Sequence, residues 1–241
     1  MKLTANSIAQ LDSLVQNCLI AGIKKVIISD GTIRGVDDKQ TTVIITDSNV
    51  PDLDGKALGV NRIDQLSARL ALIKSQGDFT LEATVAANNS DISILDLSAG
   101  KAKAQFRCAS IEAVKGVPKK INDVMAWEVK VNSKLLAVLT PAVGAMGAET
   151  VTLASRDGTS VSIECVDANK DVFTIDADEA PVFISAGTKA TSFCQKYPAK
   201  TLVTLIKEAL KSSDPVTLKI GEGGILSLKV NGFDFFLLPA Q

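Results

Sequence analysis

The sequence predicts an α+β protein of two similar domains, each with two strand–helix–strands units. The chain has 241 residues, 46% of them hydrophobic, which suffices for one large domain or for two of about 120 residues. One pattern recurs four times: a short strand, an amphipathic helix, then two or three strands with turn signals between them. We therefore expect domains at 1–110 and 125–241, joined by a linker at 111–124.

The first unit begins at the N-terminus. Residues 2–4 are expected to be extended, and residues 6–20 carry apolar side chains at helical spacing. This helical stripe consists of Ile8, Leu11, Leu14, Val15 and Cys18. Alternating strands are predicted at 24–29, 32–36 and 41–47, with Asp30-Gly31 as the hairpin turn between the first two.

The second unit opens with a strand at 56–60 and a helix at about 62–75 that ends before Gly77. Its core-facing residues are Ile63, Leu66, Leu70 and Ile73. The strands that follow are predicted at about 79–85, 91–97 and 101–108. Residues 111–123, with Gly116, Pro118 and three lysines, show no clear period, which favours a linker.

The third unit starts with a strand at 126–131, where apolar and polar residues alternate. Ser133 is expected to cap the next helix, whose apolar side consists of Leu135, Leu136, Val138 and Leu139. Pro141 and Gly144 are expected to kink or shorten that helix. Strands are predicted at about 149–155, 159–166 and 171–176, the first two joined by a turn at 156–158.

The fourth unit opens with a strand at 190–197, and Pro198 marks the start of its helix. The residues expected to face the core are Leu202, Leu205, Ile206, Ala209 and Leu210. Asp214-Pro215 ends the helix, and the last strands are predicted at about 216–220, 225–230 and 233–238. Turns at 221–224 and at Asn231-Gly232 separate these strands.

The composition argues against several classes of protein. The chain contains no histidine, so the usual general base at neutral pH and the commonest metal ligand are missing. The aspartates occur beside turn residues and form no evident acid–base pair. The four cysteines lack C-x-x-C spacing and are expected to be reduced, buried thiols, the alternatives being a disulfide or a metal site. We expect no catalytic site, no metal and no cofactor.

Charge and hydropathy limit the possible partners. A formal net charge of −1 excludes a globally basic nucleic-acid binder, so any contact with DNA must be regional. The N-terminal Met1-Lys2-Leu3-Thr4 has no apolar signal region, and no apolar run approaches the ~18 residues that span a bilayer. We expect a protein that is neither secreted nor in a membrane, located in the cytoplasm, or in the host cytoplasm if it is viral.

Four units of this kind, two per domain, resemble the construction of the DNA sliding clamps of the two-domain type. The stretch at 58–66, Leu-Gly-Val-Asn-Arg-Ile-Asp-Gln-Leu, is similar to the mid-domain helix of tailed-phage clamps. The stretch at 235–239, Phe-Phe-Leu-Leu-Pro, resembles the end of proliferating cell nuclear antigen (PCNA). The short, weakly hydrophobic linker and the few strand residues after Pro181 depart from the better-known members, which favours the phage type.

The resemblance implies a ring of three subunits, with two as an alternative, in which sheets lie outside and helices line the hole. A strand edge of one subunit pairs with an edge of the next. By position in the family, the edges are 101–108 and 171–176, with Phe106 and Phe173 as apolar anchors. The implied partners are double-stranded DNA without sequence specificity, a DNA polymerase, a clamp loader and the chain itself as a homotrimer.

The helices would hold DNA through cations that meet phosphates without reading bases. Lys200, Lys207 and Lys211 share one arc of the fourth helix, opposite its apolar arc, although an ordinary solvated lysine face has the same pattern. The other cations expected to face DNA are Arg62, Arg69, Lys74 and Lys134. No aromatic residue interleaves with these cations, so duplex DNA is a better ligand than single strands.

The resemblance also implies a groove that binds short partner peptides. Its matching residues are Val36, Val117, Phe236, Leu238 and Pro239. Phe235 is expected to belong to a final core strand instead. The sequence therefore predicts a sliding clamp that raises polymerase processivity. The alternative is a β-rich viral or cellular structural assembly protein; an enzyme has only the 221–224 glycine loop in its favour, and that loop lacks the lysine and helix of a phosphate-binding loop.

Overall fold

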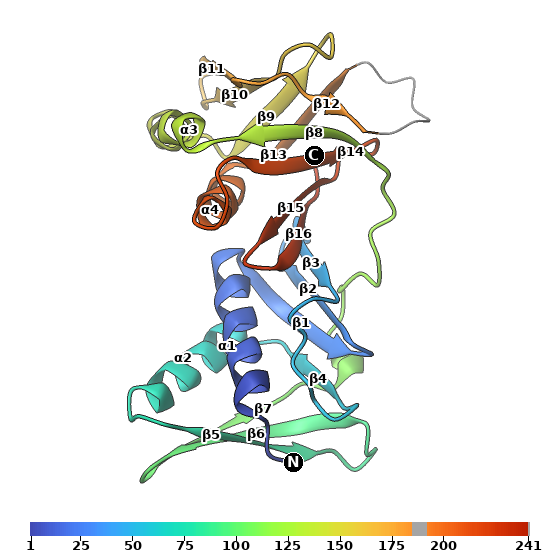
Figure 1. Ribbon diagram of the computed structural model, residues 1–241, viewed down its shortest axis with the longest axis vertical. Helices are drawn as coiled ribbons and strands as arrows, with labels where there is room; N and C mark the ends of the chain where they lie inside the picture. The colour runs from blue at the N-terminus through green and yellow to red at the C-terminus, as the bar shows by residue number, and fades with distance from the viewer. Residues whose placement is uncertain (185–191, 241) are drawn as a thin grey trace. The chain divides into compact units, whose positions relative to one another are not determined.

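The computed structural model describes residues 1–184 and 192–240. The chain divides into two compact parts, an N-terminal half (Met1–Lys120) and a C-terminal half (Ile121–Gln241). Figure 1 shows the helices and strands of each half. No helix in the described part of the chain is long and apolar enough to cross a membrane.

The N-terminal half contains two helices, one short 3-10 helix and seven strands. In chain order its elements are α1 (Ala5–Ile20), β1 (Ile23–Ser29), β2 (Thr32–Asp37), β3 (Thr42–Thr46), β4 (Ala57–Val60), α2 (Ile63–Lys74), β5 (Thr80–Val85), β6 (Asp91–Ala99), β7 (Ala102–Arg107) and η1 (Ile111–Ala113). Every helix and strand predicted for the first two units is present, with ends that differ by one or two residues in most cases.

The strands of this half form a sheet in the order β3-β2-β1-β4-β6-β5, and β7 also pairs with β6. The pairing is antiparallel except between β4 and β6. The N-terminal segment lies beside β5, where the Leu3 amide donates to the Leu81 carbonyl at 2.9 Å. The predicted extended segment at 2–4 therefore has a partner strand.

The two helices of this half pack against each other and against the sheet. Thr4 caps α1 by accepting a hydrogen bond from the Ser7 amide at 3.1 Å. The buried residues of α2 are Ile63, Leu66, Leu70 and Ile73, the four predicted from their spacing. This apolar face leaves the remaining residues of α2 at the surface.

The C-terminal half repeats the plan. In chain order its elements are β8 (Met125–Val131), α3 (Ser133–Met146), β9 (Thr150–Ser155), β10 (Ser162–Val166), β11 (Val172–Asp176), β12 (Val182–Phe183), β13 (Phe193–Pro198), α4 (Ala199–Leu210), β14 (Val216–Gly221), β15 (Leu226–Val230) and β16 (Phe233–Leu237). One group of strands runs β12-β8-β14-β15-β16 and the other runs β11-β10-β9-β13, all antiparallel. Helix α3 packs on β10 and β11, and α4 packs on strands of both groups.

Helix α3 differs from its prediction in three ways. The capping residue is Asn132, whose side chain accepts from the Leu135 amide at 2.8 Å, and Ser133 is the first helical residue. Pro141 does not end the helix, which continues to Met146, because the Ala137 carbonyl that loses its donor is at the exposed surface. Val138 was predicted on the apolar side but is 46% exposed.

Three further details concern the last two units. Leu210 is half-buried at the end of α4, where the helix leaves the core. Strand β12, which pairs with Trp127 and Glu128 of β8, was not predicted. The predicted strand at 190–197 corresponds to β13, and its first two positions lie outside the described residues.

Candidate functional site

Helix α4 presents two faces of opposite character. Its buried face contains Leu202, Leu205, Ile206 and Ala209. Lys200 and Lys207 are exposed on the other side, seven residues apart and therefore nearly aligned along the helix. Neither lysine forms an ion pair within the described residues. The two ammonium groups are free to meet an anionic ligand.

Lys211, the third lysine predicted for this face, already forms an ion pair. The Nζ atom of Lys211 lies 2.7 Å from the Glu208 carboxylate, one turn earlier on the same helix. The pair is close to neutral overall, and the Lys211 side chain remains 63% exposed. Lys211 therefore contributes less positive potential than its position on the helical wheel suggested.

Lys134 is a further unpaired cation in the C-terminal half. It is exposed in the first turn of α3 and has no ion-pair partner among the described residues. Helices α3 and α4 pack against each other, so Lys134 belongs to the same helical layer as Lys200 and Lys207. These three residues are here called the lysine face.

The two arginines predicted to face DNA, Arg62 and Arg69, are held by their surroundings. The guanidinium carbons of Arg62 and Arg69 lie 5.3 and 5.6 Å from the centre of the Phe106 ring, within cation–π range. Arg62 also donates to the Arg107 carbonyl at 2.9 Å, and Arg69 donates to the Gln65 carbonyl at 3.0 Å. Both side chains therefore cover strand β7 while keeping their charge.

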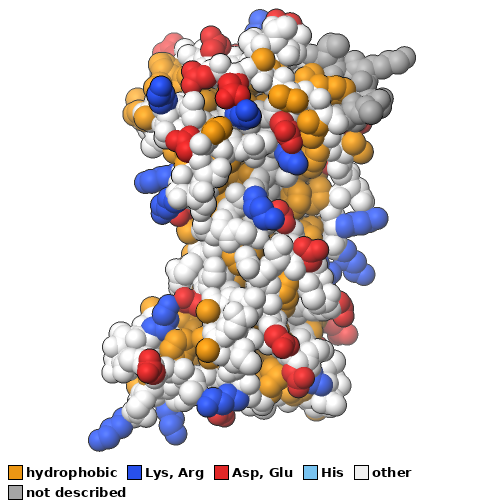
Figure 2. Space-filling model, viewed as in Figure 1, with side chains coloured by type: hydrophobic (Ala, Val, Ile, Leu, Met, Phe, Trp, Pro, Cys, Tyr) orange, Lys and Arg blue, Asp and Glu red, His pale blue; other side chains and the backbone are white. Residues whose placement is uncertain are grey.

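Lys74 connects the two helices of the N-terminal half. Its Nζ atom lies 2.6 Å from the Asp12 carboxylate on α1. Asp12 is the single charged residue of α1, so the ion pair leaves this helix pair without a free cation at that point. Figure 2 shows Lys, Arg, Asp and Glu side chains interspersed on the visible face of each half. Among the described residues, the helical lysines without an ion-pair partner are thus all in the C-terminal half.

The predicted edge strands have a free side. Among the named strands, β7 pairs with β6 alone and β11 pairs with β10 alone. On β11, Val172 is 58% exposed and Phe173 39% exposed, so this edge offers apolar surface. Phe106 of β7 is 1% exposed beneath Arg62 and Arg69, and its side chain cannot act as an apolar anchor for another chain. The prediction for Phe106 is wrong in that respect.

The residues predicted for the peptide groove differ in accessibility. Val36 is 1% exposed in the core sheet, so its side chain cannot line a groove, which corrects that assignment. Val117, Phe236, Leu238 and Pro239 are half-buried and keep accessible surface. Phe235 is fully buried in β16, as expected for a core strand.

The apolar surface at β12 and the residue that follows it was not predicted from the sequence. Val182, Phe183 and Ile184 are 51%, 41% and 40% exposed, and Phe183 contacts Trp127 edge-on at 4.9 Å. The signal in the sequence was the run Val-Phe-Ile directly after Pro181. It was too short for a strand prediction by alternation.

No family model matches this sequence, and no curated protein sequence matches it. Solved structures do match over its whole length. The chain has a TM-score of 0.64 and 16% identity to PCNA of A. fulgidus bound to the C-terminal region of FEN-1, covering 100% of this chain and 99% of that chain. The PCNA2–PCNA3 complex of Sulfolobus tokodaii gives 0.60 and 16%, with 99% and 98% covered.

A clamp from a bacterium also matches. The beta clamp of Helicobacter pylori bound to a DNA ligase peptide gives a TM-score of 0.66 at 10% identity, covering 100% of this chain and 67% of that chain. At these identities the likeness concerns the fold. The chain therefore has the fold of the DNA sliding clamps, and the matches to PCNA cover nearly the full length of both chains.

Proposed function

We propose that the chain is a DNA sliding clamp: copies of it close into a ring around duplex DNA and tether the replicative polymerase. The observation that supports this proposal is the clamp fold over the complete chain. The proposed role is mechanical, so the chain itself needs no catalytic group. A structural assembly protein would share the strands but would have no need of helices with free cations.

The lysine face supplies the proposed contact with DNA. Lys134, Lys200 and Lys207 have no carboxylate partner in the described part of the chain, so phosphates can approach them without first breaking an ion pair there. Ammonium groups on flexible side chains neutralise phosphates but do not read base edges. We propose Arg62, Arg69, Lys74 and Lys211 as secondary contacts that exchange their present partners for phosphate.

Ring closure is proposed to join β7 of one subunit to β11 of the next. Each strand has one unpaired side, and a pairing between them would remove both free edges. Phe173 and Val172 would be covered by this contact. We propose three subunits, by analogy with the length match to PCNA chains.

The partner-peptide groove is proposed to include Val117, Phe236, Leu238 and Pro239, whose half-buried side chains offer apolar surface. Segment 111–124 is proposed as the linker that borders it. The A. fulgidus protein was solved with the C-terminal region of FEN-1 and the H. pylori protein with a DNA ligase peptide, which supports peptide recruitment as the mode of binding. The proposed partners are a polymerase and a clamp loader, and the proposed location is the cytoplasm, of a host cell if the chain is viral.

The lysine face can be tested by reversing its charge. We expect the triple variant Lys134→Glu, Lys200→Glu, Lys207→Glu to bind a duplex oligonucleotide more weakly, with a flatter dependence on salt. Each lost phosphate contact should lower the slope of log K against log[salt] by about 0.9. Fluorescence anisotropy of a labelled duplex over a salt series gives both quantities.

The matched control is Lys196→Glu, a charge reversal at an exposed lysine on strand β13, outside the lysine face. It should leave affinity and slope close to those of the native chain. Native mass of each variant shows whether assembly is intact. A triple variant that assembles normally and binds duplex with undiminished affinity would remove the lysine face from the proposal.

A further inference from the structure

Strands β14 and β15 separate within the C-terminal half. They are paired at Lys219↔Ser227 and Ile220↔Leu226 and nowhere else. On its other side β14 pairs with β8 from Val216 to Gly221, and β15 pairs with β16 along its full length. The corresponding strands of the N-terminal half, β5 and β6, pair along the whole of β5. The corresponding pair of strands in the N-terminal half therefore does not share this separation.

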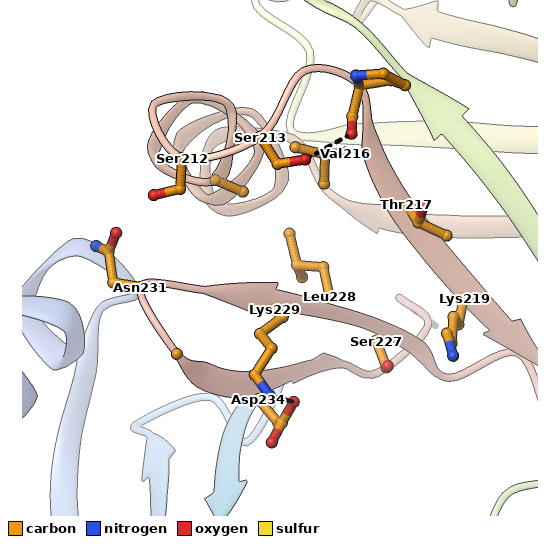
Figure 3. Close-up of a pocket in the computed structure, with 13 residues that line it drawn as sticks. Ser212, Ser213, Val216, Thr217, Lys219, Ser227, Leu228, Lys229, Asn231 and Asp234 are labelled. Atoms are coloured by element: carbon orange, nitrogen blue, oxygen red, sulfur yellow. Dashed lines mark hydrogen bonds and ion pairs between the residues drawn. The ribbon is translucent and has the colours of Figure 1, made fainter. Parts of the chain in front are cut away.

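A cavity of about 670 Å³ lies where the two strands separate. Figure 3 shows β14 on one side of it, β15 and β16 on the other, and the end of α4 above. Its inner wall contains the buried side chains of Ala209, Val216 and Leu228. Its volume is in the range of sites that bind small ligands and short peptides.

Backbone groups of both strands face this opening. The Gly221 amide donates to the Ile225 carbonyl, so Gly221 directs its peptide groups toward β15. Because alternate residues of a strand point their N–H and C=O groups to the same side, Lys219 and Thr217 do likewise. Lys219 pairs with Ser227 of β15. Continuing this register would place Thr217 opposite Lys229, but these two residues are not paired, so neither has a backbone partner on the facing strand. Water can satisfy the backbone groups of such an edge, and the strand of a bound peptide can replace that water.

The charged and polar side chains that line the cavity indicate which kind of ligand it would bind. The ionisable residues that line the cavity are Lys219, Lys229 and Asp234. The two lysines form long, exposed ion pairs, at 3.4 Å with Glu128 and at 4.0 Å with Asp234, and such pairs hold weakly. Both side chains therefore remain available to a carboxylate. The hydroxyls of Thr217 and Ser227 make no hydrogen bond with another described residue.

We infer that this opening binds an extended peptide that adds a strand to β14, with aliphatic and acidic residues in alternation. In an extended segment successive side chains point to opposite faces. One face would place aliphatic groups on Val216 and Leu228, and the other would place carboxylates beside Lys219 and Lys229. The peptide backbone would satisfy Thr217. This opening adjoins the proposed groove, because Ser227, which lines it, pairs with Phe236 of β16. It uses different residues and does not depend on DNA binding.

The probe for this site is a blocked hexapeptide of alternating valine and glutamate, added to the full-length isotope-labelled chain. We expect saturable NMR shifts of the amides of Thr217, Lys229 and their neighbours. The same peptide with lysine in place of glutamate should bind about tenfold more weakly, since two favourable charge contacts become repulsive. Free glutamate should cause no comparable shifts, because it cannot pair with the strand edge.

Two variants make the test specific. Lys219→Glu together with Lys229→Glu should reverse the preference between the two hexapeptides, whereas Lys196→Glu on β13 should leave it unchanged. Equal binding of both peptides to the native chain, shifts confined to other surfaces, or equal shifts with free glutamate would overturn the inference. If the double variant fails to fold, the comparison of peptides on the native chain decides alone.

Discussion

Close packing leaves no room for a side chain at position 59, which explains the glycine there. A Cβ at this position would lie 2.5 Å from the Ala109 carbonyl oxygen and 3.2 Å from a methyl group of Val114. Gly59→Ala should therefore push the segment after β7 away from β4 and lower the free energy of unfolding by about 1–3 kcal/mol. Urea titration followed by circular dichroism measures this change.

Gly144 provides the matched control for Gly59. It lies within α3, and a Cβ there would meet nothing within 4 Å. Gly144→Ala should stabilise the chain by about 0.5–1 kcal/mol, because alanine is the better helix former. Equal effects of the two substitutions would show that close packing at Gly59 is not the reason for its glycine.

The four cysteines should differ strongly in reactivity. Cys18 and Cys165 are buried and Cys194 is exposed on β13. Cys108 is partly accessible, but burial raises the pKa of its thiol to about 12, against a smaller opposing effect of Arg62. Since the thiolate is the reactive form, Cys108 should stay unmodified at pH 8.

We expect Ellman's reagent at pH 8 to modify one thiol per native chain quickly, and Cys194→Ser to abolish that fast phase. Denaturation in guanidinium should release the remaining thiols in both proteins. Rapid labelling of Cys194→Ser would mean that Cys108 or a core thiol is more accessible than its burial indicates.

At the scale of elements, the exposed edge β11 should control assembly. Phe173 is 39% exposed on that edge and contributes little to its own half. Phe173→Lys should therefore leave the secondary structure intact while placing a charge in the proposed contact between subunits. Native mass spectrometry at micromolar concentration should show single chains instead of rings.

Leu72→Lys serves as the control for this element. Leu72 is 61% exposed on α2, so the substitution adds the same charge at an exposed apolar residue that belongs to neither edge strand. It should leave the native mass unchanged. A Phe173→Lys protein that still forms rings would mean that β11 does not close them.

The elements were predictable wherever a local period decides the structure. The spacing of Ile63, Leu66, Leu70 and Ile73 located α2, and turn residues located most hairpins. Helix α3 was less predictable because the effect of Pro141 depends on whether the Ala137 carbonyl can reach water, which no local pattern records. Strand β12 consists of two residues, and its pairing with β8 is a long-range contact.

The residues of the candidate site were predictable from the sequence, but the ion pairs and ring contacts that some of their side chains form were not. A helical wheel places Lys200, Lys207 and Lys211 together, and it cannot show that Glu208 pairs with the third of them. The contact of Arg62 and Arg69 with Phe106 joins a helix to a strand about forty residues later in the chain. Such contacts, and the burial of Val36, follow from tertiary packing.

For the whole molecule, a closed ring and an ordinary DNA-binding protein differ in how salt releases them. Contacts between lysines and phosphates weaken steeply between about 50 and 200 mM salt. A protein ring that encloses circular DNA stays on the DNA after those contacts are lost, because circular DNA has no end from which the ring can slide off. Rings formed by concentrating dilute chains with nicked plasmid should therefore remain on the circle through this salt range.

Cutting the plasmid once should then release them, since sliding reaches the new ends. Gel filtration of labelled protein before and after the cut measures retention on the circle and release from the linear DNA. The control is Phe173→Lys, which should not form rings and should therefore be released from the uncut plasmid by salt alone. Release from uncut circles by salt would indicate binding through surface charge, and retention after the cut would indicate a salt-resistant contact that does not depend on encirclement. In either case the lysine face could still bind phosphates, but encirclement of DNA would be excluded as the basis of its function.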